Sequence, residues 1–247
     1  MVISKPLRAL SFVIAICAAC PAVAEERLTV VSDEWPPFSG RALPNQGISP
    51  DVIKAVLEHA GYDVAVEILP WARIMDGARE GEYDIVGSLF FDPDIAEYMT
   101  YGDPFYRTSI KFVQQTGSTH TVHTLAALKP YSIAVGDGFL YESKFDRATD
   151  LNKVLVTTTL QGVQMVAAGR VDLTLDSEEV VEFALQNEAP EIADAVEIMP
   201  HVLAQHDIHM AVRNTLPNKD KVISDFNRVL AEMKADGRLD ALLSKHR

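Results

Sequence analysis

The 247-residue sequence contains only two cysteines, Cys17 and Cys20, and both lie near its N-terminus. From residue 25 onward the chain has no thiol, which excludes disulfides, a cysteine nucleophile and a thiolate metal site from that part. An exported chain without disulfides depends on a full hydrophobic core. About 220 residues are enough for one large or two small domains.

Basic residues are also scarce, because 22 Lys and Arg stand against 35 Asp and Glu, for a formal net charge of −13. A surface this acidic repels nucleic acid and anionic lipid head groups, so we expect neither as a partner. Long apolar runs are absent after the first 24 residues, so nothing there predicts a membrane-spanning helix.

The first 24 residues have the pattern of a secretory signal peptide. A basic start over residues 1–8 precedes an apolar run from Ala9 to Cys20, and small residues at 22 and 24 form a cleavage site. We therefore expect export to the periplasm, with cleavage after Ala24. An uncleaved anchor helix and a lipoprotein attached through Cys20 remain open as alternatives.

Strand-like and helix-like segments alternate along the rest of the chain. The predicted strands cover Arg27–Ser32, Asp63–Leu69, Tyr83–Phe90, Tyr131–Gly136, Asn152–Thr157 and Val171–Leu175. The predicted helices cover 49–60, with Ser49 as N-cap, 70–81, 160–168, 176–186 and 219–235, and a further one follows the turn at 137–138. Repeated βαβ units indicate parallel sheets with helices on both faces. Two short runs, Ile110–Gln115 and Ile208–Val212, are typical of extended connectors.

Catalytic signatures are missing. The sequence has no Gly-rich phosphate loop of the Walker or dinucleotide type and no G-x-S-x-G nucleophile motif. His120 and His123 lie in a predicted loop, and His206 and His209 have a spacing that places them on opposite faces of a strand. We therefore predict neither a metal site nor a cofactor.

Recognition features are better represented, and they follow the first two strands. Trp35 and Phe38 stand in a WPPF segment directly after the first strand, where they form either a rigid apolar wall or a packed loop. Trp71 and Arg73 open the helix after the second strand, and Arg73 either clamps an anion or pairs with an acid. The carboxyl ends of strands are where open α/β sheets bind ligands.

Three more candidates belong to later strands. Ser88 lies late in the third strand and offers a hydroxyl group. Gly138 and Asp176 follow strands of the second series, so they face the first set across a cleft. Asp176 is either the acceptor for a ligand cation or a helix cap.

Seven segments in this order resemble the family 3 extracellular solute-binding proteins, which serve polar amino acid ABC transporters. They are EWPPFSG (34–40), GISPDVIKAVLEHAGYDV (47–64), PWAR (70–73), GEYDIVGS (81–88), YGDPFY (101–106), GRVDLTLDSEEV (169–180) and the closing FNRVLAEMKADGRLDALLSKH (226–246). The PWAR segment is similar to a subgroup in which a Pro-Trp-x-Arg motif opens this helix.

The resemblance implies an α/β fold of two lobes, each a mostly parallel sheet flanked by helices, joined by two extended hinge strands. Residues 25–112 and 206–247 would form lobe 1, and residues 113–205 lobe 2. Such a protein closes around a small polar solute without catalysing a reaction, and as a monomer it passes the solute to an ABC-type permease.

One departure from the family pattern concerns the ligand. Family members that bind amino acids carry Thr-x-x-Arg, whose Arg holds the α-carboxylate, but here those positions are Asp92 and Ile95. A hydrogen bond to a charged group contributes about 1.5–3 kcal/mol, so the loss of this contact lowers the affinity for an ordinary amino acid about tenfold or more. The Gly-Thr/Ser pair of the second lobe is also replaced, by Gly138 and Phe139.

By contrast, Asp176 matches the amine-binding Asp of the family. The combination predicts a ligand with an amine or other cationic group and no obligatory α-carboxylate. An amino acid remains the alternative if Arg73 or Arg107 takes over the carboxylate. Two other functions stay open, a ligand-presenting sensor component for a receptor and a periplasmic dehydratase, which the same family fold also supports.

Overall fold

The computed structural model describes residue 1 and residues 27–246, so the predicted signal peptide and its cleavage site after Ala24 lie outside the described residues. The strands are β1 (Arg27–Ser32), β2 (Asp63–Ile68), β3 (Ile85–Leu89), β4 (Met99–Tyr101), β5 (Tyr106–Gln115), β6 (Ser132–Gly136), β7 (Asn152–Val156), β8 (Leu173–Ser177) and β9 (Val196–Arg213). Short 3₁₀ turns and loops join the elements.

The α-helices are α1 (Ile48–His59), α2 (Trp71–Glu80), α3 (Pro93–Ala96), α4 (Leu125–Leu128), α5 (Ser143–Arg147), α6 (Thr159–Ala167), α7 (Glu178–Phe183), α8 (Lys219–Ala235) and α9 (Arg238–Leu243). Within residues 27–246 we find no helix with the length and apolar character needed to cross a bilayer.

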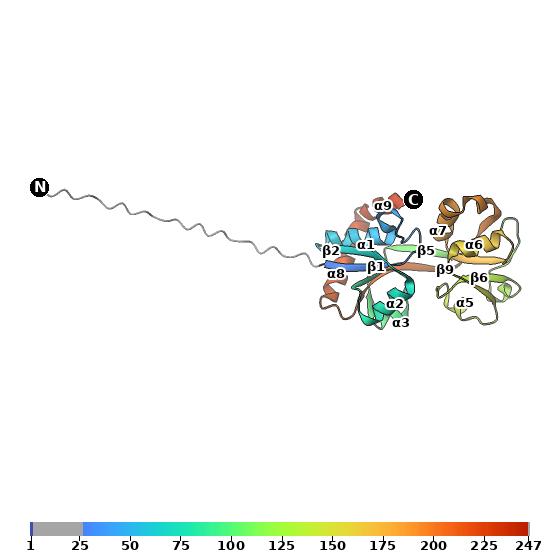
Figure 1. Cartoon of the computed structure of the whole chain (residues 1–247), viewed down its shortest axis with the longest axis horizontal. Coiled ribbons are helices and arrows are strands. Elements are labelled where there is room, and N and C mark those ends of the chain that lie inside the picture. Colours follow the sequence, from blue (N-terminus) through green and yellow to red (C-terminus); the bar gives the residue numbers. More distant parts are fainter. Residues whose placement is uncertain (2–26, 247) are drawn as a thin grey trace.

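The elements form two lobes connected by β5 and β9 (Figure 1). Lobe 1 contains β1–β4, α1–α3, α8 and α9, whereas lobe 2 contains β6–β8 and α4–α7. The predicted two-lobed α/β fold is confirmed. The predicted lobe boundaries, 112/113 and 205/206, fall inside the two strands that run through both lobes.

Each lobe is built on three parallel strands. In lobe 1, β1 lies between β2 and β3, and in lobe 2, β6 lies between β7 and β8. The crossing strands pair antiparallel, β9 with β3 and β5, and β5 with β8. The resulting order is β2-β1-β3-β9-β5-β8-β6-β7. Because β5 and β9 together are hydrogen-bonded into the sheets of both lobes, the chain passes between the lobes twice without a flexible linker.

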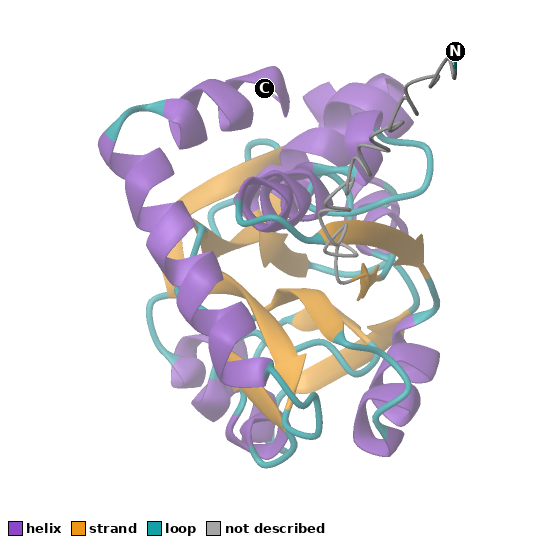
Figure 2. Cartoon of the chain, turned by 90° about the vertical axis from the view of Figure 1, so that its left-hand side faces the viewer, coloured by secondary structure: helices purple, strands orange, loops and turns teal. Residues whose placement is uncertain are grey.

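Helices cover both faces of the sheet in each lobe (Figure 1), and Figure 2, viewed from the lobe 1 side, shows the strands between helices. The buried side chains divide accordingly into two clusters per lobe. In β1, Leu28 and Val30 pack against α1 and α8 on one face, and Val31 packs against α2 on the other. A strand buried on both faces needs apolar residues at successive positions, which Val30 and Val31 provide.

Several predicted elements are confirmed closely, among them β1, α2 and α8. Helix α2 begins after the extended Pro70 and ends where Gly81 adopts φ 75°. The left-handed region costs little for glycine, so the helix stops there. Helix α8 covers the whole predicted amphipathic segment.

Two predictions about element ends were wrong. Ser49 is not the N-cap of α1, which begins at Ile48 after Gly47. The Ile48 and Ser49 amides donate to the carbonyls of Pro37 and Phe38, at 3.1 and 2.8 Å, so the WPPF loop satisfies the first turn instead of a capping side chain.

The second wrong prediction is the start of a helix at residue 176, because β8 continues to Ser177 and α7 begins only at Glu178. Of the two alternatives left open for Asp176, the structure therefore excludes the helix cap. The strand is longer than expected since Asp176 and Ser177 pair with Lys111 and Ile110 of β5. A strand that gains a ladder partner continues past the point where its own apolar pattern ends.

Candidate functional site

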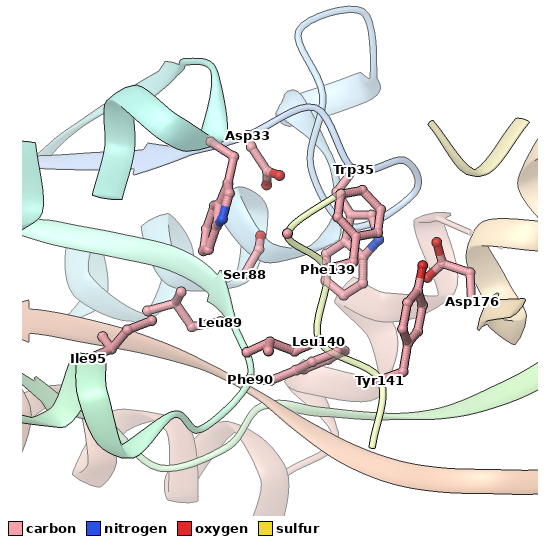
Figure 3. A pocket seen from close by; sticks show the side chains of 12 residues that line it. Asp33, Trp35, Ser88, Leu89, Phe90, Ile95, Phe139, Leu140, Tyr141 and Asp176 are labelled. Atoms are coloured by element: carbon pink, nitrogen blue, oxygen red, sulfur yellow. The ribbon is translucent and has the colours of Figure 1, made fainter. Parts of the chain in front are cut away.

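A pocket lies between the lobes where the carboxyl ends of the parallel strands meet. Its volume is about 640 Å³, including the part that opens to solvent. The residues that line it are Asp33, Trp35, Trp71, Ser88, Leu89, Phe90 and Ile95 from lobe 1 and Gly138, Phe139, Leu140, Tyr141 and Asp176 from lobe 2 (Figure 3). The topology explains this position, because β1, β3, β6 and β8 all end at this edge.

Five of the seven predicted ligand-binding residues line this pocket. They are Trp35, Trp71, Ser88, Gly138 and Asp176. They come from five separate segments, and each segment is at or just beyond the carboxyl end of a strand. The prediction that strands of the two series face each other across a cleft agrees with this arrangement.

Phe38, the sixth predicted residue, lies behind the pocket. Its side chain is fully buried, and its ring packs 4.6 Å from that of Trp35 and 5.3 Å from that of Tyr106, measured between centroids. Phe38 therefore supports the Trp35 wall without facing the ligand space. Both alternatives for the WPPF segment are realised, since one aromatic lines the pocket and the other packs in the core.

Arg73, the seventh predicted residue, lies on the exposed face of α2 and is not among the pocket-lining residues. In a helix that buries Ile74 and Met75, position 73 turns toward solvent. Arg107 is also engaged elsewhere, because its guanidinium pairs with the Asp207 carboxylate at 2.6 Å. Among the residues that line the pocket, none is Lys, Arg or His.

Asp176 provides a buried carboxylate at the lobe 2 side of the pocket, with 3% of the residue exposed. The Ser177 amide donates to Oδ1 at 2.6 Å, the Thr159 hydroxyl donates to Oδ2, and the Trp35 side chain also hydrogen-bonds to this carboxylate. Burial nevertheless raises the pKa of Asp176 to about 6. The Trp35 contact links the two lobes directly, because Trp35 belongs to lobe 1.

Asp33 provides a second carboxylate, from lobe 1, which the sequence analysis did not single out. It follows the last residue of β1, and its carboxylate points into the pocket beside Ser88 (Figure 3). Burial, with smaller contributions from the charges of Glu34 and Asp176, raises its pKa to about 6. Its position directly after a strand was a signal that could have predicted a role in the pocket.

Ser88 adopts a left-handed backbone conformation, with φ 59°. It sits where the β3–β9 pairing slips between Val86 and Leu89, and its hydroxyl donates to that of Ser39 at 3.3 Å. Only glycine adopts this φ without cost. The irregularity turns the Ser88 side chain toward the pocket.

Aromatic rings make up much of the remaining wall. Phe90 stacks on His206 of β9, with centroids 4.4 Å apart, and it packs against the buried clusters of both lobes. Tyr141 is buried, and its hydroxyl accepts a hydrogen bond from the Gly136 amide at 2.8 Å. Burial and the charge of Asp176 raise the pKa of Tyr141 far above its ordinary value, so it remains a neutral phenol.

Ile95 lies in this wall, at the position where the resemblance places a carboxylate-binding Arg. Among the described residues, no group of three or more His, Cys, Asp and Glu side chains is arranged to hold a metal ion. The predicted loop histidine His123 instead lies next to His201, with 3.3 Å between their Nδ1 atoms. His206 and His209 do not converge, because they contact the carbonyls of Tyr141 and Gly102.

The chain was compared with known proteins and structures. No curated protein sequence matches it. Among solved structures, a histidine kinase sensor domain with similarity to periplasmic binding proteins has a TM-score of 0.76 at 18% identity, covering 90% of this chain and 96% of the other. An ancestral arginine-binding protein bound to arginine has a TM-score of 0.74 at 21% identity, covering 90% and 98%.

An ancestral amino-acid-binding protein, a precursor of cyclohexadienyl dehydratase, has a TM-score of 0.70 at 22% identity and covers 89% of this chain and 94% of the other. At these identities the likeness concerns the fold. The family model described as bacterial extracellular solute-binding proteins, family 3, matches residues 28–247. With nearly all of the described residues matched and the two-lobed fold in place, the chain belongs to the family 3 bacterial extracellular solute-binding proteins.

Proposed function

We propose that this protein captures a small amine-bearing solute in the interlobe pocket and delivers it to an ABC-type importer. The observation that carries the proposal is the charge of the pocket, which has two carboxylates, Asp33 and Asp176, and no basic lining residue. A solute-binding protein with such a pocket selects for positive charge.

The physical argument is one of desolvation. A ligand carboxylate in this pocket would lie near two acids, the buried Asp176 and the half-buried Asp33, with no cation to compensate it, which is costly in a low-dielectric site. An ammonium group has the opposite effect, because it neutralises a carboxylate and is attracted to the faces of rings such as Trp35 and Trp71. Ile95 supplies only apolar contact.

Closure follows from the hinge strands. We infer that the lobes rotate about β5 and β9, with residues 25–112 and 206–247 moving against 113–205. The Trp35–Asp176 contact between the lobes supports a closed arrangement for the structure. A ligand that contacts both lobes stabilises this arrangement, and the closed complex is what a permease recognises.

The cellular setting is part of the proposal. The signal-peptide pattern of residues 1–24 supports a periplasmic location after cleavage behind Ala24. There it acts as a monomer and as a binding protein without catalytic turnover. Its solute is small and polar, and its protein partner is the membrane permease.

A thermal unfolding experiment tests the proposal. The probes are n-pentylamine and L-norleucine, which differ only by an α-carboxylate, measured at pH 7.5 over a range of concentrations. A ligand at 100 times its Kd adds about 2.7 kcal/mol to the free energy of unfolding, which shifts the melting temperature clearly. We expect stabilisation by the amine and much less by the amino acid.

Two variants complete the test. Asp176→Asn should remove most of the stabilisation by n-pentylamine, whereas Arg73→Ala should leave it unchanged because Arg73 lies outside the pocket. Strong stabilisation by L-norleucine that is lost in Arg73→Ala would contradict the proposal of an amine-bearing solute and favour an amino acid instead.

A sensor role is the second candidate, and the likeness to a histidine kinase sensor domain favours it. The same pocket would then present the solute to a receptor. Co-purification with a permease after membrane solubilisation would favour transport, and co-purification with a receptor kinase would favour sensing. The dehydratase alternative is less well supported, because its anionic substrate lacks a basic partner in this pocket; a turnover assay with a cyclohexadienyl acid tests it.

A further inference from the structure

The pocket holds two carboxylates that come from opposite lobes. Asp33 extends from the end of β1 in lobe 1, and Asp176 lies in β8 of lobe 2. In the view of Figure 3 their carboxylates are separated by the Trp35 side chain. They are nonetheless close enough for the charge of Asp176 to raise the pKa of Asp33.

A single ammonium group cannot compensate both of them. Bound at Asp176, it leaves Asp33 as a charge whose hydrogen bonds, among the described residues, reach only its own backbone amide. Bound at Asp33, it leaves Asp176 almost fully buried, with neutral donors only. An uncompensated buried carboxylate is costly and either takes up a proton or repels its neighbour.

Both carboxylates have room for another donor. An ionised carboxylate has about four acceptor positions, and Asp176 uses three of them, for Ser177, Thr159 and Trp35. The Asp33 carboxylate has fewer of its acceptor positions occupied, and it faces the pocket beside the Ser88 hydroxyl (Figure 3). A cation at each position is therefore compatible with the contacts already made.

The wall between the two acids suits an uncharged spacer. In Figure 3 the rings of Trp35 and Phe139 lie between Asp33 and Asp176, and Leu89, Leu140 and Ile95 are further apolar residues of the pocket lining. Methylene groups pack well against such side chains, and aromatic faces also attract a nearby cation. The pocket thus has two acidic groups with apolar side chains between and beside them.

We propose that the solute is a diamine, with one ammonium group bound by Asp33 of lobe 1 and the other by Asp176 of lobe 2. The inference rests on the proposed function and makes it more specific. A dication held in this way joins the lobes electrostatically, so that binding and closure are one event.

The test measures Kd by calorimetry at pH 7.5 for α,ω-diamines of three to six carbons, each beside the n-alkylamine of the same length. We expect at least one diamine to bind about tenfold or more tightly than its alkylamine, since it makes a second charge-assisted contact. Asp33→Asn and Asp176→Asn should each reduce that ratio to near one.

Glu34→Gln is the matched control, because it removes the same charge from the next residue, whose exposed side chain does not line the pocket. It should keep the diamine preference. Circular dichroism melting of each empty variant establishes that it is folded. A second readout is the radius of gyration by small-angle scattering, which the diamine should lower in the wild type and not in Asp33→Asn.

The outcomes separate the two proposals. If alkylamines bind and no diamine binds more tightly, the diamine inference is overturned and the proposed function stands. If Asp33→Asn retains the diamine preference, Asp33 is not the second cation site and the inference fails as well. If neither amine class binds, the proposed function itself is wrong.

Discussion

At the scale of single residues, the two pocket carboxyls make binding depend on pH. The pKa values of Asp33 and Asp176 are both raised from 3.8 to about 6. A cationic ligand binds the ionised forms and lowers both pKa values. We therefore expect affinity for the bound amine to rise between about pH 5 and pH 7 and to level off above.

Calorimetry at pH 5.5 in two buffers of different ionisation enthalpy measures this effect, because binding should release protons to the buffer. At pH 7.5 the release should be small. The stability of the protein without ligand should have the opposite pH dependence to the affinity. Its folded carboxyls hold more protons than the unfolded chain between about pH 4 and 6, so these two groups make unfolding easier as pH rises through that range. Proton uptake on binding would contradict the assignment of either carboxyl.

Ser88 gives a second prediction at this scale. Its φ of 59° is costly for any residue with a Cβ, so Ser88→Gly should be more stable than Ser88→Ala by about 1 kcal/mol. Both variants lose the hydroxyl contact with Ser39, and only glycine removes the strain. Chemical denaturation of the two variants measures the difference. Equal stabilities would mean that the backbone relaxes when the side chain changes.

At the scale of elements, the first turn of α7 connects lobe 2 to the crossing strand β5. The Tyr106 hydroxyl donates to Glu179 Oε1 at 3.1 Å, and the Thr108 hydroxyl donates to Oε2. The next residue, Val180, is buried in the lobe 1 core cluster. This turn therefore packs against lobe 1 in the closed arrangement.

Glu179→Ala should accordingly weaken closure. We expect a severalfold loss of amine affinity and a larger radius of gyration in small-angle scattering, since two hydrogen bonds to a charged group are removed. Glu182→Ala is the control, because Glu182 is exposed on the same helix. If both variants behave alike, the contact of α7 with β5 does not control closure.

The element boundaries differ in how far local sequence predicts them. Helix α8 was predictable because Val222, Phe226 and Val229 recur on one face at helical spacing, and all three are buried. For strand β9 the residue pattern predicted only Ile208 to Val212, although the strand covers 18 residues. Its earlier part alternates weakly and contains Pro200, so pairing with β5 determines its length.

At the scale of the whole molecule, function depends on bringing five separate segments to one edge. The sequence predicted which segments these are, because strand ends can be read from apolar runs and the residues that follow them. It did not predict which side chain of each segment faces the ligand. In the loop after β1 the pocket receives Asp33 and Trp35, while Phe38 turns into the core.

The sequence by itself therefore determined the alternation of strands and helices in each lobe, the resemblance to the family, and the presence of Ile95 where the family pattern has a carboxylate-binding Arg. The tertiary structure decided that Asp33 joins Asp176, that Arg73 points to solvent, and that no basic side chain enters the pocket lining. The physical reason is that periodicity is a local property of the chain. The direction of a loop side chain, and the burial that shifts its pKa, depend on how the opposite lobe packs against it.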